Sequence, residues 1–600
     1  MNLVEKLDHV LAACDPEQAF LVLADEQLTY GSLREHVAKL GGVFEKMRLQ
    51  SGDRVLILST DEATVTSIFA ASLRMGLTAI VGDAEAPANE VLELAAVGDP
   101  AAIFADRQLL SGIREPLPVP ASRVVCIGRE AGDGSIPSGA THCYSTLLRT
   151  VDAVSKFPDV QDDTLGLIVF TSGSTSKPKG VCLSHSNLYA QLEIFGQAYG
   201  FDTQSKILNI LPMHHVDGLI RGPLAALFFG AQIHRPLKFS LQNLKNLLDA
   251  VPTRRVTHFI SVPAMLNLIN RLIDPTLRPF QGPSFRFIIC SADILEAKLW
   301  KEFEDRFGVK IVNAYGLSEV VCDALFSGPH IETRSIGTIG VPLGCNARVV
   351  DESGNQSGPE EVGELALKGP TVMQGYFRQP DETNRVLQDG WFNTGDLVRR
   401  GRDGYYRLEG RKKTVVISAG VTIHPESITS VILEMPGIAE AVSFGVGDDV
   451  WGQRLVTCVT VDPEISADKQ DVFAHCRENL SPEKIPSEIH FVQHLPRGPS
   501  GNVILASVQK QLSNTAPDCH PAATVFEVAA ECFNLPVDML TLVSSPYNTE
   551  GWDSPAHLSF IMRLEEVFQV RLSAEDIIQL GTLADAEEII ERLNLSEINV

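Results

Sequence analysis

The sequence predicts a large α/β domain, then a smaller α+β domain and a short all-α unit. Three observations support this prediction. Short apolar runs bounded by turn residues alternate with helical periodicity over residues 1–409, a pattern typical of buried strands and covering helices. The chain of 600 residues is too long for one hydrophobic core, so several domains are expected. Residues 524–600 differ from the rest in charge.

The composition is that of a globular protein, with 44% apolar and 21% charged residues. A net charge of −25 opposes nucleic-acid binding. The N-terminal MNLVEKLD carries charges where a signal peptide is apolar, and no apolar run approaches the roughly 20 residues that span a membrane. The eleven cysteines form no C-x-x-C pair or zinc-type cluster. We therefore expect a cytoplasmic protein with no nucleic-acid partner, no membrane span and reduced, mostly buried cysteines.

The strands of the α/β domain are expected at the short apolar runs, which lie at residues 54–58, 78–81, 165–170, 206–211, 258–262 and 285–290. The smaller domain, residues 410–510, has a strand pattern at 414–418, 441–446 and 454–461, and helical patterns at 425–433 and 469–479. Residues 511–523 are small, polar and rich in proline, as in a linker.

Residues 524–600 form the predicted all-α unit. They contain fourteen acidic residues, three arginines and no lysine, and so carry eleven of the 25 net negative charges. Apolar residues recur with helical spacing in three stripes, which begin at Val525, Leu558 and Leu583. Three or four short helices with acidic outer faces should pack as a small bundle.

A loop rich in hydroxyl, glycine and lysine residues, TSGSTSKPKGV at 171–181, directly follows an apolar run. Glycine lets the backbone approach a polyphosphate, N–H and hydroxyl groups donate to its oxygens, and lysine adds positive charge. The loop does not have the Walker A spacing. By itself it fits a phosphate site or a solvated turn equally well.

Six further segments follow this loop along the chain. They are LPMHHVDG at 211–218, NAYGLSE at 313–319, GELALKG at 363–369 with Gly375-Tyr376, WFNTGDL at 391–397, Gly410-Arg411, and LPRGPSG at 495–501. Their order and spacing resemble the adenylate-forming superfamily of acyl-CoA synthetases, peptide-synthetase adenylation domains and luciferases. The resemblance covers about residues 15–510. It implies an N-terminal adenylation domain (1–409), a mobile C-terminal subdomain (410–510) and an active site between them.

The resemblance also implies a reaction. A carboxylate attacks the α-phosphorus of ATP, which gives acyl-AMP and pyrophosphate, and a thiol then displaces AMP. The implied nucleotide-binding residues are Thr171, Ser172, Gly173, Ser174, Thr175, Lys179, Ser291, Ala292, Asp293, Asn313, Tyr315, Gly316, Ser318, Asp396 and Arg411. The hydroxyls and Lys179 would hold pyrophosphate, Asp396 and Arg411 would lie at the ribose, and Tyr315 with residues 291–293 would sandwich adenine.

Three residues are implied to take part in catalysis. Glu319 matches the carboxylate that binds Mg²⁺ and acts as metal ligand and catalytic residue. His215 matches the histidine that borders the substrate carboxylate, and Lys413 matches the pivot of the subdomain. Without the resemblance, a structural histidine, a core tyrosine at 315 and an ordinary turn at Asp396 would also fit these positions.

Two positions depart from the family pattern. Ser176 replaces a glycine of the phosphate loop. Asn502 stands where the family has the catalytic lysine that bridges carboxylate and α-phosphate, and loss of such a group typically costs roughly 10²–10³ in rate. Either adenylation is slow, or another cation (Lys484 or Lys510) substitutes, or the activity is degenerate.

The segment GWDSPAHL at 551–558 resembles the modification site of acyl and peptidyl carrier proteins. The resemblance implies 4'-phosphopantetheine on Ser554, attached by a phosphopantetheinyl transferase, with downstream acyl-accepting synthases as partners. A plain helix N-cap explains the segment almost as well, and Pro555 replaces the usual leucine.

The acyl pocket is expected to include His214, Asp217, Lys238 and Leu317. Asp217 lies near the position that pairs a substrate ammonium in amino-acid-activating relatives, whereas HHVDG is closer to the acyl-CoA synthetase version. Lys238-Phe239 is similar to a pair used for a distal carboxylate. We expect a small carboxylic acid without an α-amine, adenylated and then loaded onto the chain's own carrier unit. The alternatives are an acyl-CoA ligase with a degenerate tail, and an impaired carrier or scaffold protein.

Overall fold

The structure is a computed structural model of the whole chain. It describes all residues except 129–136, 138, 172–177, 238–242, 275, 294, 296, 352–353, 412–415, 419–420, 424, 449–451, 462–467, 493–494, 496–507, 510–511, 513–523, 534, 547, 550–551, 553, 569, 571 and 598–600.

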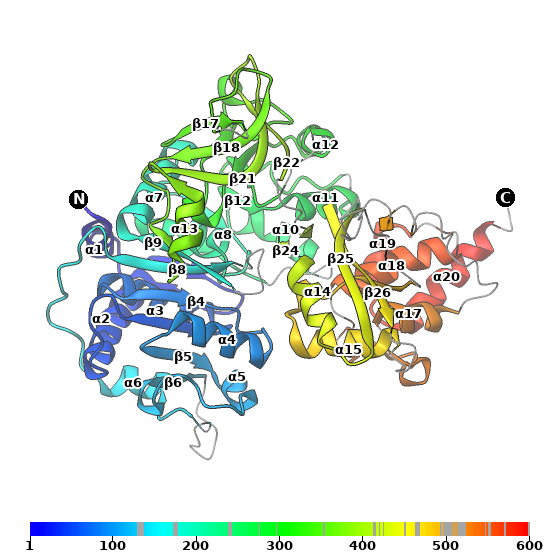
Figure 1. The fold of residues 1–600 in the computed structure, drawn as a ribbon, viewed down its shortest axis with the longest axis horizontal. Helices are drawn as coiled ribbons and strands as arrows, with labels where there is room; N and C mark the ends of the chain where they lie inside the picture. The colour runs from blue at the N-terminus through cyan, green and yellow to red at the C-terminus, as the bar shows by residue number, and fades with distance from the viewer. Residues whose placement is uncertain are drawn as a thin grey trace.

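Two large sheets form the centre of the N-terminal α/β domain (Figure 1). The first has the order β16-β15-β14-β13-β12-β10-β11-β1-β2 and the second the order β19-β9-β8-β4-β3-β5-β6-β7. Their central strands pair in parallel, whereas strands at or next to the edges, such as β2, β15 and β9, pair antiparallel. Buried parallel strands joined by helices explain the short, wholly apolar runs in the sequence.

The strands of the first sheet are β1 (Ala19–Val22), β2 (Gln27–Thr29), β10 (Lys206–Leu208), β11 (Gln232–His234), β12 (His258–Ser261), β13 (Phe287–Cys290), β14 (Ile311–Tyr315), β15 (Leu325–Ser327) and β16 (Val341–Pro342). Those of the second are β3 (Arg54–Leu58), β4 (Thr78–Val81), β5 (Ala102–Asp106), β6 (Val124–Ile127), β7 (His142–Cys143), β8 (Leu165–Thr171), β9 (Lys179–Ser184) and β19 (Gly375–Tyr376). All six strands expected from the sequence are present, although three of them are shorter than expected.

Helices cover these sheets, and their ends follow ordinary capping chemistry. Asp61 caps one helix by accepting from the N–H groups of Ala63 and Thr64. Ser184 and Asn187 form a capping box on another. The helices are α1 (Leu3–Ala13), α2 (Tyr30–Lys46), α3 (Glu62–Arg74), α4 (Ala88–Gly98), α5 (Arg107–Gly112), α6 (Tyr144–Thr150), α7 (His185–Tyr199), α8 (Val216–Leu219), α9 (Ala225–Phe229), α10 (Leu244–Thr253), α11 (Pro263–Leu272) and α12 (Ala297–Phe307).

A third, antiparallel sheet ends the N-terminal domain, with the order β17-β18-β21-β20 and β22 beside β21. Its elements are β17 (Asn346–Val350), β18 (Val362–Lys368), α13 (Pro380–Val386), β20 (Leu387–Gln388), β21 (Trp391–Arg400) and β22 (Tyr406–Arg411). The sequence pattern did not separate this sheet from the α/β part. Its strands are only partly buried and alternate between faces, unlike the apolar runs used to find the other strands.

The smaller C-terminal domain has the expected α+β elements, with its own apolar core. They are β23 (Val416–Ser418), β24 (Val421–Ile423), α14 (Pro425–Leu433), β25 (Ile438–Asp448), β26 (Gly452–Val461), α15 (Lys469–Asn479) and β27 (Glu488–Phe491).

The last part of the chain is helical, and α19 lies against α11 of the N-terminal domain. The helices are α17 (Val525–Phe533), α18 (Ser554–Phe568), α19 (Ala574–Gln579) and α20 (Leu583–Glu597). In their core, Trp552 stacks on Phe533 with a centroid distance of 4.2 Å. Four of the exposed large apolar side chains lie between α17 and α18, at Val537, Met539, Leu542 and Val543.

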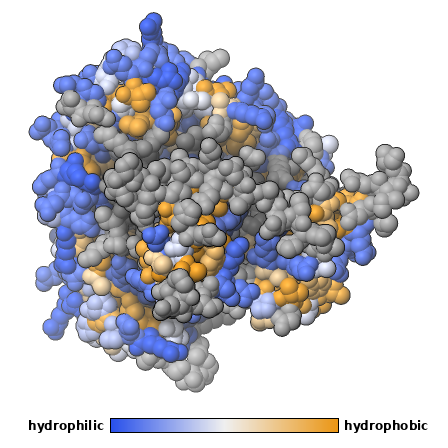
Figure 2. All heavy atoms as spheres, turned by 45° about the vertical axis from the view of Figure 1, so that its right-hand side comes forward, coloured by the Kyte–Doolittle hydropathy of each residue, from blue (hydrophilic) through white to orange (hydrophobic). Residues whose placement is uncertain are grey.

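Among the described residues on the face shown in Figure 2, hydrophilic side chains predominate around the outside, and hydrophobic side chains form several separate patches. Among the described residues, no helix combines the length and apolarity needed to cross a membrane. The ten cysteines within the described ranges are free, and seven of them are buried.

Buried histidines predict acid sensitivity. Burial lowers the pKa of His185 and His557 to about 4, and of His234 and His258 to about 3. Between these values and the ordinary 6.5, the unfolded chain binds more protons than the folded one. The free energy of unfolding should therefore fall as the pH drops from 7 toward 4, by up to about 1.4 kcal/mol per pH unit for each histidine.

Denaturant titrations at pH 7, 6 and 5 would measure this slope. In His258→Gln the slope should be shallower because one titrating group is gone. Equal slopes for the variant and the unsubstituted protein would contradict the assignment for His258.

Candidate active site

The predicted phosphate loop is the connection of an antiparallel hairpin. β8 ends at Thr171 and β9 begins at Lys179, and these two residues face each other in the register. The Thr171 hydroxyl donates to the carbonyl of Lys179 at 3.4 Å. Ser172, Gly173, Ser174 and Thr175 lie outside the described residues. The hairpin therefore fixes both ends of the predicted loop.

Lys179 is buried, 6% exposed, and has an internal anion as its partner. Its ammonium lies 2.5 Å from the Glu382 carboxylate, which also pairs with Arg385. The hydrogen bond from Lys179 lowers the pKa of Glu382. The same ammonium lies 5.1 Å from the ring centroid of Tyr376, a cation–π distance. The ammonium of Lys179, which was predicted to hold phosphate, is therefore already paired with the carboxylate of Glu382.

A second contact links this lysine to the predicted metal ligand. The Tyr376 hydroxyl donates to Glu319 Oε1 at 2.8 Å, and burial followed by the charge of Glu319 raises the pKa of Tyr376. Tyr376 lies on β19, which pairs with β9, whereas Glu319 lies in a short 3₁₀ helix after β14. Residues of two sheets thus connect the lysine and the carboxylate.

The predicted nucleotide residues surround the C-terminal end of β14. Asn313 donates to the carbonyl of Thr338 at 2.9 Å, and the Tyr315 hydroxyl donates to Asp396 Oδ2 at 2.5 Å. Asp396 is buried, and its register partner across β21 and β22 is Arg411. Gly316, Leu317 and Ser318 follow β14 and are partly buried. A Cβ on Gly316 would lie 1.5 Å from the carbonyl oxygen of Cys322, so only glycine fits there.

The predicted adenine segment follows β13. Ser291 is buried, and Ala292 has a φ of +73°, which is rare for a residue with a side chain. A Cβ on Gly452 would lie 2.9 Å from Asp293 Oδ2. Gly452 begins β26, so the small domain lies against this segment.

The predicted acyl residues lie in the turn before and at the start of α8. The rings of His214 and His215 are 4.4 Å apart, and His214 Nδ1 is 4.0 Å from Asp83. Desolvation by the surrounding protein, with His214 as second cause, lowers the pKa of the solvent-accessible His215 to about 4. Asp217 Oδ1 lies 2.7 Å from Arg221, and burial raises the pKa of Asp217 against the effect of that arginine. His215 is therefore neutral near pH 7.

The small domain also contacts the N-terminal domain close to these histidines. Glu90 in the first turn of α4 accepts from the N–H of Ser481 at 2.7 Å and pairs with Lys484 at 3.3 Å. Burial lowers the pKa of His214, the carboxylates of Glu483 and Glu85 oppose this shift, and Lys484 adds a smaller lowering. The charges of Glu483 and Lys484, both in the small domain, thus act on the pKa of His214.

Three predicted residues, Lys238, Lys413 and Asn502, lie outside the described residues. Ser554 is the first residue of α18. The sequence reasoning missed Arg221, Asp323, Glu382 and Glu90. A charge inside the apolar run LIRGPLAALFF was the available signal for Arg221, whereas nothing near Glu382 marked it as the partner of Lys179.

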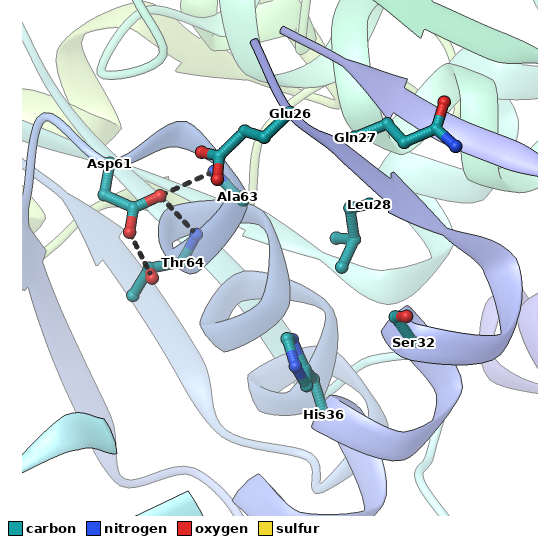
Figure 3. Close-up of a pocket in the computed structure, with 8 residues that line it drawn as sticks. All are labelled: Glu26, Gln27, Leu28, Ser32, His36, Asp61, Ala63 and Thr64. Carbon is teal, nitrogen blue, oxygen red and sulfur yellow. Dashed lines mark hydrogen bonds between the residues drawn. The ribbon is translucent and has the colours of Figure 1, made fainter.

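A cavity of about 320 Å³ lies elsewhere in the N-terminal domain, between the ends of α2 and α3 (Figure 3). It is lined by Glu26, Gln27, Leu28, Ser32, His36, Asp61, Ala63 and Thr64. None of the predicted site residues lines it. Its Asp61 carboxylate caps α3. Because no predicted site residue lines the cavity, it is separate from the candidate active site.

Comparison with known proteins agrees with this geometry. The family model for AMP-binding enzymes matches residues 9–377, and the model for the AMP-binding enzyme C-terminal domain matches residues 427–502. The chain belongs to the adenylate-forming superfamily. It is an AMP-forming acid–thiol ligase, with the large α/β and small C-terminal domains of that family. The helices from α17 onward lie beyond both matched ranges.

Several adenylate-forming relatives are CoA ligases. Sulfoacetate–CoA ligase of Cupriavidus necator is 30% identical over 501 residues, which cover 82% of this chain and 95% of that one. Indoleacetate–CoA ligase of Aromatoleum aromaticum is 29% identical, covering 84% and 96%. The amide bond synthetase McbA from Marinactinospora thermotolerans has the same fold, with a TM-score of 0.73 at 22% identity, covering 85% and 99%.

ATP and Mg²⁺ are the cofactors expected of an adenylate-forming enzyme. The groups gathered here fit both: a carboxylate oxygen of Glu319 suits Mg²⁺, and the Lys179 ammonium suits phosphate. When bound, Mg²⁺ would neutralise phosphate charge beside Glu319.

The contact between Lys179 and Glu382 predicts an effect on ATP binding. Phosphate must compete with the Glu382 carboxylate for the buried ammonium. Glu382→Gln removes that competing charge and should lower the KM for ATP about five-fold, equivalent to about 1 kcal/mol. Steady-state kinetics with varied ATP would measure it.

Asp381→Asn is the matched control, because this exposed neighbour lies on the same helix. Its KM for ATP should not change. A higher KM in Glu382→Gln would mean instead that Glu382 holds Lys179 in place for phosphate.

Proposed function

We propose that this protein is an acyl-CoA ligase that activates a small carboxylic acid as acyl-AMP and transfers the acyl group to CoA. In the first step a carboxylate oxygen bonds to the α-phosphorus of ATP and pyrophosphate leaves. In the second, the CoA thiol attacks the acyl carbonyl and AMP leaves. The CoA-ligase relatives support this reading over transfer to the chain's own carrier unit.

The observation that carries the proposal is the chain of contacts from Lys179 through Tyr376 to Glu319. It joins a lysine that would bind phosphate to a carboxylate that would bind Mg²⁺, and pyrophosphate departure requires both kinds of group. Thr171 and the loop after it would donate further hydrogen bonds to the pyrophosphate oxygens. Asp396 and Arg411 would lie at the ribose, with Asp396 releasing the Tyr315 hydroxyl.

The acid should lack an α-amine. An ammonium-binding carboxylate needs to be available to the substrate, but Asp217 is already paired with Arg221 at 2.7 Å. A neutral His215 beside it can donate one hydrogen bond to a substrate carboxylate.

Lys484 is the cation that would compensate for Asn502. It belongs to the small domain, as the missing lysine would, and its charge acts on His214. The ion pair with Glu90 partly offsets the positive charge of Lys484, so we infer that adenylation is slow.

The test is AMP release from ATP, Mg²⁺ and CoA with a panel of aliphatic, aromatic and sulfonated acids and the matching α-amino acids. At least one acid should give AMP and the corresponding acyl-CoA, identified by mass, and the amino acids should not. Release from an amino acid alone would contradict the proposed substrate class.

Asn502→Lys in the same assay should raise the turnover number, by up to about 10²-fold. Asn502→Gln is its matched control, because it adds length without charge. No increase with lysine would mean that Lys484 or another group already supplies the charge.

A second candidate acceptor is the chain's own Ser554, carrying 4'-phosphopantetheine. It is favoured by the start of α18 at Ser554 and by the helices around it, which lie beyond both matched ranges. Phosphopantetheinyl transferase and CoA should then increase the intact mass by about 340 Da, the mass of the group. Ser554→Ala is the control, and an unchanged mass of the unsubstituted protein would exclude this acceptor.

A further inference from the structure

Arg221 is the one charged side chain among the largest fully buried side chains of the described residues, at 1% exposure. Burying a guanidinium is costly unless its donors are satisfied by carboxylates or other acceptors. Arg221 Nη1 lies 2.7 Å from Asp217 Oδ1, and Nε donates to Asp323 Oδ2 at 3.0 Å. Nη2 donates to the other oxygen of Asp323, and Nη1 also donates to the Ser291 hydroxyl. The cation is therefore held from three sides.

The three partners come from separate parts of the chain. Asp217 belongs to α8 beside the histidine pair, Ser291 begins the segment after β13, and Asp323 follows Glu319 by four residues. Under the proposed function these parts serve the acid, adenine and Mg²⁺, respectively. One guanidinium thus connects the three subsites.

The backbone is unusual at Arg221 itself and close to two of its three partners, Asp323 and Ser291. Arg221 lies in a π-helical turn, Ile220–Leu224, that contains Pro223 and a non-helical Gly222; such turns are frequent at functional sites. Val321, two residues before Asp323, has φ +70° and ψ −65°, the rare γ-turn conformation. Ala292 beside Ser291 has a φ of +73°. Strained backbone persists where the surrounding structure over-determines it.

Two residues of α7 form further hydrogen bonds with Asp323. The Tyr199 hydroxyl donates to Asp323 Oδ2 at 2.6 Å, and the Asp323 N–H donates to Gln191 Oε1 at 3.1 Å. Both Tyr199 and Gln191 are buried on α7. Asp323 is thus buried and hydrogen-bonded on several sides, whereas Asp217, whose side chain is 18% exposed, is the member of the network nearest to solvent.

We propose that Arg221 is a positioning residue for adenylation: by holding Asp217, Ser291 and Asp323 in one network, it keeps the acid and the nucleotide in register for attack. The inference rests on the proposed function. Lysine cannot replace arginine here, because an ammonium cannot reproduce the planar fork that bridges Asp323 in two places while reaching Asp217 and Ser291.

The test compares Arg221→Lys with the unsubstituted protein, using the most active acid of the panel, at a temperature at which thermal melting shows both fully folded. Misplacing reactants by about 1 Å costs about 10²-fold in rate, so kcat should fall about 10²-fold while the KM values change less than about three-fold. The matched control is Arg74→Lys, at an arginine that pairs with Asp8 at 2.8 Å away from the site. It should keep the turnover number.

The double variant Arg221→Lys/Asp217→Asn separates positioning from independent effects. A shared network predicts that the double variant is about as slow as Arg221→Lys alone, whereas independent roles predict losses that multiply. A kcat of folded Arg221→Lys within three-fold of the unsubstituted protein would overturn the proposal, and so would multiplying losses.

If Arg221→Lys does not fold, Ser291→Ala replaces it. This change removes one acceptor from Nη1 and should lower kcat about ten-fold; an unchanged kcat would overturn the proposal. Absence of acid-dependent AMP release by the unsubstituted protein would instead overturn the proposed function.

Discussion

One buried positive charge constrains the centre of this molecule. The Arg221 guanidinium is out of water and needs its carboxylate and hydroxyl partners. The segments after β13 and β14 and the start of α8 must therefore be assembled together. The two sheets of the N-terminal domain supply the rigid frame, and the π-helical turn and the γ-turn let the chain meet those partners. The geometry of the site is thus a consequence of charge burial as well as of strand order.

A second constraint acts at the phosphate end. Lys179 sits at the start of β9 with Glu382 as its anion, and Tyr376 links it to Glu319. Glu382 therefore pairs with the ammonium that is predicted to bind phosphate. Glu90 contacts Ser481 and Lys484, so charges of both domains lie close to the histidine pair.

Much of the architecture could be predicted from the sequence, because buried parallel strands are continuous apolar runs and the late helices have clear stripes. The third sheet could not be separated, since its half-exposed strands give weaker patterns. For the candidate site, the motifs predicted Glu319, Lys179, Tyr315 and Asp396. They could not identify Glu382 or Asp323, because an ion pair between residues more than one hundred positions apart leaves no local pattern.

The proposed function depends on the formation of an acyl adenylate from ATP. The most direct measurement is exchange of labelled pyrophosphate into ATP in the absence of CoA, with each acid of the panel. We expect exchange that depends on a carboxylic acid without an α-amine and on Mg²⁺, and that is faster in Asn502→Lys. Absence of exchange with every acid of the panel, in both proteins, would contradict the proposed function.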